Sequence, residues 1–173
     1  MQKILVIGSG GAGKSTFSAR LGASLGLPVV HLDACYWSAG WVERDKEEWR
    51  QIVGRLADED AWIMDGNYGG TMDIRLAACD TVIFLDMPRF LCLWRILRRR
   101  LRFHGQTRPD MAEGCDEHLT WEFIRWVWNY PAARRPQILA RLSALRDEKH
   151  VIVLHSGRQV EAFLAGLAQH GRL

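Results

Sequence analysis

The segment at residues 8–16, GSGGAGKST, constrains the fold of this chain more than any other stretch. It fits the phosphate-binding pattern G-x-x-x-x-G-K-[ST], in which Gly8, Gly13, Lys14 and Ser15 occupy the fixed positions. Glycines let consecutive backbone N–H groups curl around a polyphosphate, because no Cβ blocks the dihedrals or the close approach. The pattern predicts that the loop holds phosphate with the following residues: Gly8, Gly10, Gly11, Ala12, Gly13, Lys14, Ser15 and Thr16.

The segments on either side of this loop supply the context that the pattern needs. Residues 3–7, KILVI, form a β-branched apolar run that predicts a strand, and residues 16–25 can form a helix whose N-terminal end favours an anion. A glycine-rich turn without a ligand is the alternative, and the order strand, loop, helix argues against it. We therefore expect nucleoside triphosphate binding, with Lys14 on the β and γ phosphates and the Ser15 hydroxyl on Mg²⁺.

Composition limits the chain to a narrow set of classes. A length of 173 residues with 48% hydrophobic and 25% charged residues predicts one domain with mobile inserts. The net charge of +3 does not by itself imply a nucleic-acid partner. Four scattered cysteines without C-x-x-C spacing argue against a zinc ribbon and fit reduced thiols. No secretory signal precedes the first strand and no apolar run approaches the roughly 20 residues of a bilayer span, so we expect a cytoplasmic protein without a membrane partner.

Apolar runs alternate with helical patterns along the rest of the chain. Strands are predicted at residues 27–32, 61–64, 81–85 and 151–154, and helices at residues 45–56 and from about residue 159. This alternation predicts a three-layer α/β/α fold around a five-stranded parallel sheet. We expect one domain over residues 1–173, with an acceptor-side insert at about 34–60 and a lid insert at about 96–140.

The lid insert follows from the long gap between the fourth and fifth strands. About 65 residues separate them, far more than a crossover connection needs. The gap contains an arginine-rich helix at residues 88–103, a loop at residues 104–110 and an aromatic segment at residues 121–130. Core packing is the preferred interpretation of the aromatic segment, and a base-stacking platform is the alternative. The composition of the insert predicts a lid over the phosphates.

Three predicted strands end at an aspartate, namely Asp33, Asp65 and Asp86. Open α/β folds bind ligands at this carboxyl edge of the sheet, so the repetition suggests a site. We expect Asp65 to support Mg²⁺, and Asp33 to orient or deprotonate an acceptor hydroxyl or to help hold the metal. The alternative for each is a carboxylate that caps a turn or a helix, and this is the preferred interpretation for Asp86.

Arginines form the second group of candidate site residues. Four of them share one face of the predicted helix at residues 88–103, namely Arg95, Arg98, Arg99 and Arg102. Positioned guanidiniums can stabilise the charge that develops during phosphoryl transfer, and a solvated basic face is the alternative. Arg134 and Arg135 could supply further phosphate contacts from across the lid.

Several separated segments together resemble the adenylate-kinase-like P-loop proteins labelled DNA topology modulation or FlaR-related kinases. The resemblance implies the nucleoside/nucleotide kinase fold, with ATP on the phosphate loop and a lid built from the insert. It covers nearly the whole chain and rests on the phosphate loop, HLDACYW at 31–37, WIMDGNY at 62–68, Arg75, DMPR at 86–89 and WEFIRWVWNYP at 121–131.

The same resemblance implies roles for individual residues. It places Arg95 on adenine, Arg99 on phosphates, and Ser156 with Gly157 in a loop that touches adenine. The chain also departs from the adenylate kinase pattern, because Asn67 and Tyr68 replace Phe-Pro-Arg and the Thr-Gly-Asp-Met-Leu-Arg acceptor segment is missing. Residues 32–37 are similar to the aspartate-containing segment of uridine-kinase-like enzymes, which leaves the acceptor open.

The sequence thus predicts an ATP- and Mg²⁺-dependent phosphotransferase that acts on a nucleotide, a nucleoside or an acceptor of similar size. Its expected catalytic residues are Lys14, Asp33, Arg99, Arg134 and Arg135, with Ser15 and Asp65 organising the metal. The alternative is a nucleotide-dependent nucleic-acid-binding regulator that uses residues 98–102 and the tryptophan-rich segment, although nucleic acid is not the expected partner. A signalling GTPase is disfavoured because no Asn-Lys-x-Asp segment occurs, and a motor ATPase because no Asp-Glu pair ends an apolar strand.

Overall fold

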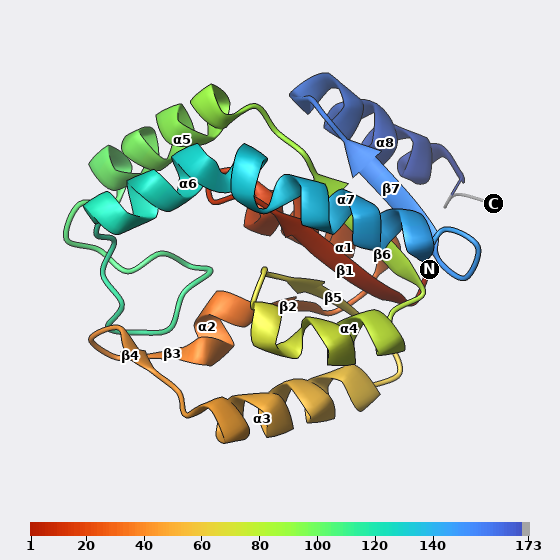
Figure 1. Cartoon of the computed structure of the whole chain (residues 1–173), viewed down its shortest axis with the longest axis horizontal. Helices are drawn as coiled ribbons and strands as arrows, with labels where there is room; N and C mark the ends of the chain where they lie inside the picture. The colour runs from red at the N-terminus through yellow and green to blue at the C-terminus, as the bar shows by residue number, and fades with distance from the viewer. Residues whose placement is uncertain (171–173) are drawn as a thin grey trace.

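The computed structural model describes residues 1–170, which fold around a five-stranded parallel sheet (Figure 1). Each strand pairs in parallel with its neighbours. The strand order across the sheet is β2 (Val29–His31), β5 (Trp62–Asp65), β1 (Lys3–Gly8), β6 (Thr81–Leu85) and β7 (His150–Leu154). This arrangement confirms the α/β fold with a five-stranded parallel sheet that the alternation of apolar and helical segments predicts.

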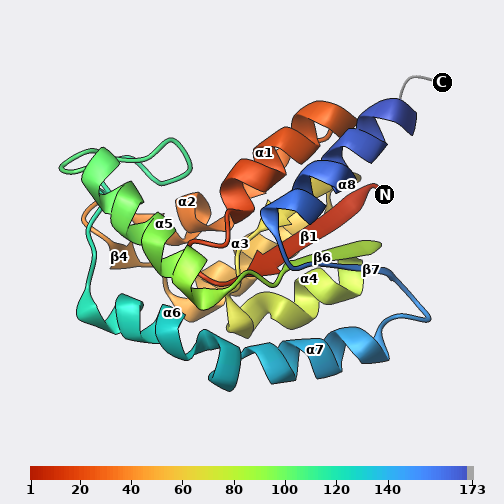
Figure 2. The ribbon, with the colours of Figure 1, turned by 90° about the horizontal axis from the view of Figure 1, so that it is seen from above.

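The strands are apolar in their central residues, and helices cover both faces of the sheet. Ile4 and Val6 of β1 pack with helices α1 (Lys14–Leu25) and α8 (Gly157–His170). Leu5 and Ile7 point to the opposite face, since successive side chains of a strand alternate. On that face they share a core with helices α3 (Lys46–Asp58), α4 (Met72–Ala78) and α7 (Arg135–Ala144). Figure 2 shows α1 and α8 together on one side of the sheet and α7 on the other.

Helix α3 illustrates how local sequence defines an element. Asp45 caps its N-terminus, since the carboxylate accepts hydrogen bonds from the backbone N–H groups of Glu47 at 2.8 Å and Glu48 at 3.2 Å. Trp49 and Val53 lie one turn apart on its buried face. The predicted helix at residues 45–56 is therefore confirmed and extends to Asp58.

The second strand is shorter than predicted. It ends at His31 and is followed by the short helix α2 (Leu32–Tyr36), so Asp33 lies in the first turn of a helix instead of at the tip of a strand. A small hairpin of strands β3 (Trp37–Ser38) and β4 (Val42–Glu43) comes next. The 3-10 helix at Gly69–Thr71 precedes α4. Hydrophobic periodicity did not predict these short elements, which follow β2 and β5.

The segment between β6 and β7 contains three helices and one long loop. Helix α5 (Arg89–Arg102) leads into residues 103–120, which we call the lid loop, and helix α6 (Trp121–Ala133) follows. The lid loop runs along the left side of Figure 1 and bends inward below α6. Helix α7 belongs to the cover of the sheet, because Leu142 is buried in its core. No helix among residues 1–170 combines the length and the hydropathy of a membrane span.

Candidate functional site

A large cleft opens at the carboxyl end of the sheet, where open α/β folds bind ligands. Its volume of about 1400 Å³ exceeds the roughly 300–1,000 Å³ of a site for one small molecule. One side, which we call the P-loop wall, consists of residues 10–16 and helix α5. The opposite side, the hairpin wall, consists of α2, the β3–β4 hairpin and residues 66–68. The lid loop and α6 border both walls, so the cleft has room for two ligands side by side.

The P-loop, residues 8–16, keeps its shape through bonds to its own backbone. Lys14 Nζ donates to the carbonyl oxygens of Gly8 at 3.1 Å and Ser9 at 3.2 Å. Helix α1 begins at Lys14, two positions before the predicted start, so its first N–H groups, which have no partner within the helix, belong to the P-loop. Residues 10–16 all line the cleft, and Gly8 lies behind them at the end of β1. Such a helix N-terminus after a glycine-rich loop can bind an anion.

Helices α5 and α6 pack so closely on the P-loop that two of its positions need glycine. A Cβ on Gly10 would lie 2.6 Å from the ring of Phe123 on α6, and one on Gly11 would collide with the backbone of Cys92 on α5. Gly11 also has a φ of 76°, which disfavours other residues. Arg95 of α5 donates to the Ala12 carbonyl oxygen at 2.9 Å. The loop is therefore preformed by its neighbours.

Asn67 connects the P-loop to the end of β5. Its side-chain Oδ1 accepts from the Gly8 N–H at 3.2 Å, and its Nδ2 donates to the Gly8 carbonyl oxygen at 2.8 Å. Asn67 also lines the cleft. In the sequence it stands out only as a departure from the adenylate kinase pattern, so its contact with the P-loop was missed.

Asp65, the expected magnesium ligand, is buried at the end of β5 and does not line the cleft. Its Oδ2 lies 3.0 Å from Nδ1 of His31, which does line the cleft. The hydrogen bond to Asp65 raises the pKa of His31, and burial opposes this shift. Any contact of Asp65 with a ligand in the cleft therefore passes through His31 or water.

Asp33, which the sequence predicts to face the acceptor or to help hold the metal, lies on the hairpin wall. The Tyr68 hydroxyl donates to Asp33 Oδ1 at 2.6 Å. Burial and the neighbouring Asp33 charge raise the pKa of Tyr68 far above its usual value. Tyr68 therefore keeps its proton and holds the carboxylate in a fixed position at the cleft.

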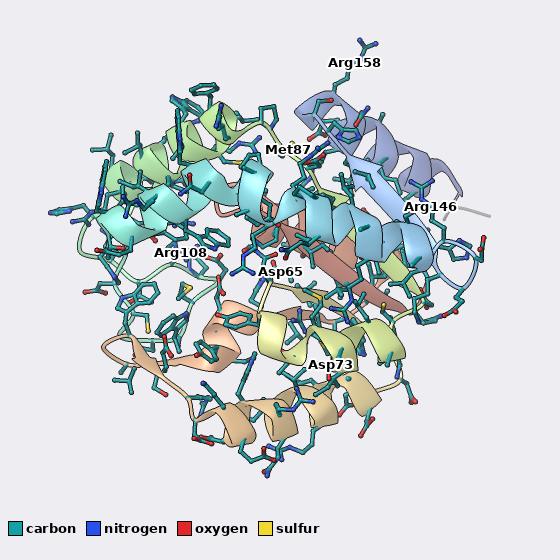
Figure 3. The ribbon with its side chains drawn as sticks, viewed as in Figure 1. Asp65, Asp73, Met87, Arg108, Arg146 and Arg158 are labelled. Atoms are coloured by element: carbon teal, nitrogen blue, oxygen red, sulfur yellow. The ribbon has the colours of Figure 1, made fainter. Side chains whose placement is uncertain are left out.

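The arginine face of α5 lines the cleft as its spacing predicts. All four arginines contribute to the P-loop wall, namely Arg95, Arg98, Arg99 and Arg102. Arg108 reaches the same cleft from the lid loop and is 9% exposed. Figure 3 shows Arg108 and Asp65 between α6 and α2 in its view. Sequence reasoning missed Arg108 because it belongs to no periodic pattern.

Glu117 of the lid loop joins Arg99 and Arg108. Its Oε1 lies 2.8 Å from Arg99 Nε, its Oε2 lies 2.7 Å from Arg108 Nε, and its side chain is 1% exposed. Arg108 also pairs with Asp110 at 2.9 Å. Burial and the charge of Arg108 lower the pKa of Arg99, while Glu117 opposes this shift. The network fixes the lid loop on α5 and holds two guanidiniums at the cleft.

The structure does not bring Arg134 and Arg135 to the cleft. Arg135 Nε pairs with Asp86 Oδ2 at 2.9 Å, and His155 Nδ1 lies 3.1 Å from the same oxygen. Arg134 is exposed and lies outside the cleft lining. The reason is that α7 packs on the sheet through Leu142. The junction of α6 and α7 therefore lies beside Asp86, which follows β6.

The end of β7 and the start of α8 form another border of the cleft. Gly157 lines it, as expected, together with Val160. Ser156 instead caps α8, because its Oγ accepts from the Gln159 N–H at 3.3 Å. Gly157 is therefore the one of the two predicted adenine-loop residues that lines the cleft.

The donor groups of the cleft fit a magnesium ion that arrives with phosphate. Ser15 offers a hydroxyl on the P-loop wall, and Asp33 offers a carboxylate on the hairpin wall. Among the described residues, no group of three or more His, Cys, Asp and Glu side chains is placed to hold a metal. Mg²⁺ usually binds proteins through one or two such groups and takes phosphate oxygens and waters as its other ligands.

Solved structures of kinases share the fold of the chain. The shikimate kinase from Acinetobacter baumannii, in complex with shikimate, is 17% identical with a TM-score of 0.57 over 98% of this chain and 92% of that one. The gluconokinase from Sinorhizobium meliloti 1021 is 17% identical with a TM-score of 0.50 over 98% and 94%. No protein-family model and no curated protein sequence matches the chain. At these identities, the likeness concerns the fold.

Proposed function

We propose that the chain is an ATP-dependent phosphotransferase that moves the γ-phosphate of ATP to a hydroxyl group of a small acceptor. The observation that carries this proposal is that one cleft has the P-loop and its arginines on one wall and Asp33 on the other. A donor and an acceptor bound on opposite walls would meet between them. The kinases named above support the proposal through their fold, because their names denote enzymes for small acceptors.

In this proposal the P-loop wall binds ATP. Lys14 exchanges the carbonyl oxygens of Gly8 and Ser9 for the β and γ phosphates, and α1 directs its N-terminus at the anion. Arg95 and Gly157 border the space for adenine, as the resemblance to adenylate-kinase-like proteins implies. Arg99 and Arg108 stabilise the charge that develops on the transferred group.

Magnesium would polarise the phosphate oxygens and neutralise part of their charge. Ser15 would hold it directly, and Asp65 would act through His31 or through water. Asp33 would accept a hydrogen bond from the acceptor hydroxyl and take its proton during transfer. Tyr68 would keep Asp33 in place for this step.

At the finer level, we propose membership in the adenylate-kinase-like proteins labelled DNA topology modulation. Support comes from residues 31–37, which carry Asp33, and residues 62–68, which carry Asn67 at the P-loop. We also propose a cytoplasmic location, which the four free cysteines favour.

Replacement of Lys14 by alanine tests the donor side of this proposal. We expect Lys14→Ala to lower phosphotransfer by at least about 10²–10³-fold, because a positioned charge that stabilises the transition state is lost. Lys46→Ala, an exposed position on α3, is the matched control, and far-ultraviolet circular dichroism of both variants should equal that of the parent. If Lys14→Ala turns over ATP at the parental rate, the assignment is wrong.

A nucleotide-dependent nucleic-acid-binding regulator is the second candidate, favoured by the exposed side of α5. Trp94 and Leu101 are 54% and 82% exposed there, and the guanidinium of Arg98 lies 5.3 Å from the Trp94 ring centroid. Arginine and aromatic side chains of this kind bind single strands through phosphate contacts and stacking. A DNA affinity that falls steeply with salt, together with no transfer to any acceptor, would favour the regulator.

A further inference from the structure

Charge is distributed unequally between the two walls of the cleft. The P-loop wall carries only cations among its charged side chains, namely Lys14, Arg95, Arg98, Arg99 and Arg102. Arg20, at the border with α8, is paired with Glu161 at 2.5 Å. The hairpin wall instead presents the carboxylates of Asp33 and Glu43. The two walls therefore attract ligands of different charge.

The arginines near the hairpin wall are used for other contacts. Arg44 Nε donates to the Cys35 carbonyl oxygen at 2.7 Å, and its Nη1 pairs with Glu48 at 2.9 Å. Arg50 pairs with Asp73 at 3.0 Å. In residues 1–170, no lysine or arginine of α2, the hairpin or residues 66–68 lines the cleft.

Arg75 is the deepest of these arginines and is fully buried below residues 66–68. Its guanidinium donates to the carbonyl oxygens of Gly66 at 2.9 Å, Asn67 at 3.1 Å and Tyr68 at 2.7 Å. Burial lowers the pKa of Arg75 to about 10. Arg75 therefore supports the backbone of the hairpin wall and does not reach the cleft.

Arg108 is the arginine of the lid loop that lines the cleft. Its charge is already balanced by Glu117 at 2.7 Å and Asp110 at 2.9 Å. Asp110 also lines the cleft and adds a third carboxylate beside Asp33 and Glu43. Among residues 1–170, a phosphorylated or carboxylated acceptor in this half of the cleft would face these carboxylates with no unpaired lysine or arginine beside it, and His31 on the same side is already paired with Asp65.

Aromatic rings replace the missing cations on this side of the cleft. Trp37 and Trp41 lie 5.3 Å apart between ring centroids, Trp41 lies 4.4 Å from the ring of His118, and all three line the cleft. Ring faces of this kind bind planar, uncharged ring systems by stacking.

The backbone of Trp41 is held in an unusual conformation. Its φ of 62° lies in the left-handed region, which residues other than glycine rarely adopt. The indole Nε1 donates to the Asp116 carbonyl oxygen at 2.9 Å, and Gly40 N–H donates to the Gly114 carbonyl oxygen at 2.9 Å. Backbone strain that the surroundings maintain is found most often at binding and active sites. The strain therefore supports a binding role for the ring of Trp41.

We infer that the acceptor is an uncharged alcohol that carries a planar ring, of which a nucleoside is the simplest representative. This inference rests on the proposed phosphotransferase function. The ring packs against Trp37 and Trp41, and the hydroxyl faces Asp33. In the transfer step, the acceptor oxygen bonds to the γ-phosphorus, the bond from the γ-phosphorus to the bridging oxygen of ADP breaks, and the hydroxyl proton passes to Asp33.

Matched acceptors test the inference directly. The protein is incubated with ATP and Mg²⁺ together with each nucleoside, its 5′-monophosphate, and uncharged and carboxylated alcohols without a planar ring. We expect kcat/KM to be at least about tenfold higher for nucleosides than for their monophosphates. Equal or better transfer to monophosphates, to carboxylated alcohols or to ringless alcohols overturns the inference and leaves the phosphotransferase proposal standing. Transfer to no acceptor overturns both.

Substitutions then assign the preference to particular side chains. Trp37→Ala should raise KM for the nucleoside about tenfold with KM for ATP unchanged, and Trp37→Phe should restore much of the affinity. Trp128→Ala, at an exposed position of α6 outside the cleft, is the matched control. Asp110→Asn should improve transfer to monophosphates relative to nucleosides, because Arg108 then has one counter-charge fewer. An unchanged acceptor preference in both Trp37→Ala and Asp110→Asn would contradict the inference.

Discussion

The two walls of the cleft are held in place by different kinds of contact. On the P-loop wall, the long cations Lys14 and Arg95 bind backbone carbonyl oxygens, so main-chain geometry decides where they lie. On the hairpin wall, side-chain rings pack on one another, as Tyr36 and Tyr68 do at 4.7 Å between centroids and Trp49 and Tyr68 at 5.2 Å. The position of the residues in the first wall depends on the backbone, and in the second wall it depends on how the side chains pack.

The two walls differ in the substitutions that they tolerate. A substitution in the P-loop disturbs the loop itself, because α5 and α6 leave no room at Gly10 and Gly11. A substitution of Trp37, Trp41 or Asp33 on the hairpin wall changes a ring or a carboxylate that lines the cleft. The hydrogen bonds from this wall to the P-loop come from Asn67 instead. Under the proposed function, the fold would therefore constrain donor binding, whereas acceptor choice would depend on a few exchangeable side chains.

The largest expected effect is a loss of kcat from a substitution on the hairpin wall, with ATP affinity on the P-loop wall unchanged. Asp33→Asn should lower kcat by about 10²–10⁴-fold, because the amide cannot take the proton of the acceptor hydroxyl. The affinity for ATP, measured by titration calorimetry, should stay near that of the parent. Asp58→Asn, at the exposed end of α3, is the control. A parallel loss of ATP affinity would show that the two walls do not act separately.

The next effect concerns the network that borders both walls. Glu117→Gln removes the charge that balances Arg99 and Arg108, and we expect a loss of about 3 kcal/mol in the stability of the lid loop. Amide hydrogen exchange in residues 103–120 should become faster, and KM for ATP should rise. Glu113→Gln, exposed on the same loop, should change neither. Unchanged exchange in Glu117→Gln would mean that the ion pairs do not hold the loop.

A smaller effect tests the side-chain support of the P-loop. Asn67→Ala removes two hydrogen bonds to Gly8, which together contribute about 1–3 kcal/mol. The free energy of urea unfolding should fall by this amount and KM for ATP should rise. Asn129→Ala, exposed on α6, serves for comparison. Equal stability of the two variants would show that the loop is maintained by α5 and α6 alone.

The smallest expected effect compares thiols behind the two walls. Burial raises the pKa of Cys35 on α2 and of Cys92 on α5, so at pH 8 each has a smaller thiolate fraction than an exposed cysteine. Alkylation by iodoacetamide, followed by mass spectrometry, should be slow at both and accelerate as the pH rises. An acceptor should slow the reaction at Cys35 more than at Cys92. Equal protection of both thiols would contradict separate binding regions.

The strand framework could be predicted because short apolar runs that alternate with helical patterns are typical of a parallel sheet covered on both faces. Residues 81–85 form β6 with both ends as predicted, and the loop at residues 8–16 follows β1. The arginine face of α5 could also be predicted, since helical spacing places its four arginines together. These features depend on local periodicity, which the sequence displays directly.

Other parts of the site depend on contacts between distant segments. Arg108 and Glu117 meet Arg99 only because the lid loop turns back on α5, and no spacing in the chain indicates that turn. Arg135 lies beside Asp86 because α7 packs on the sheet. The residue roles in catalysis remain predictions, which the substitutions above are designed to test.

The attachment of the lid loop to the β3–β4 hairpin has a kinetic consequence. The hydrogen bonds from Gly40 to Gly114 and from Trp41 to Asp116 join the lid loop to the hairpin wall. If a ligand passes between the lid loop and the hairpin, it can enter or leave only while these bonds are broken. The rate at which these bonds break would then limit both the rate of ligand binding and the rate of product release. The turnover rate would thus depend on two hydrogen bonds that take no part in phosphate transfer.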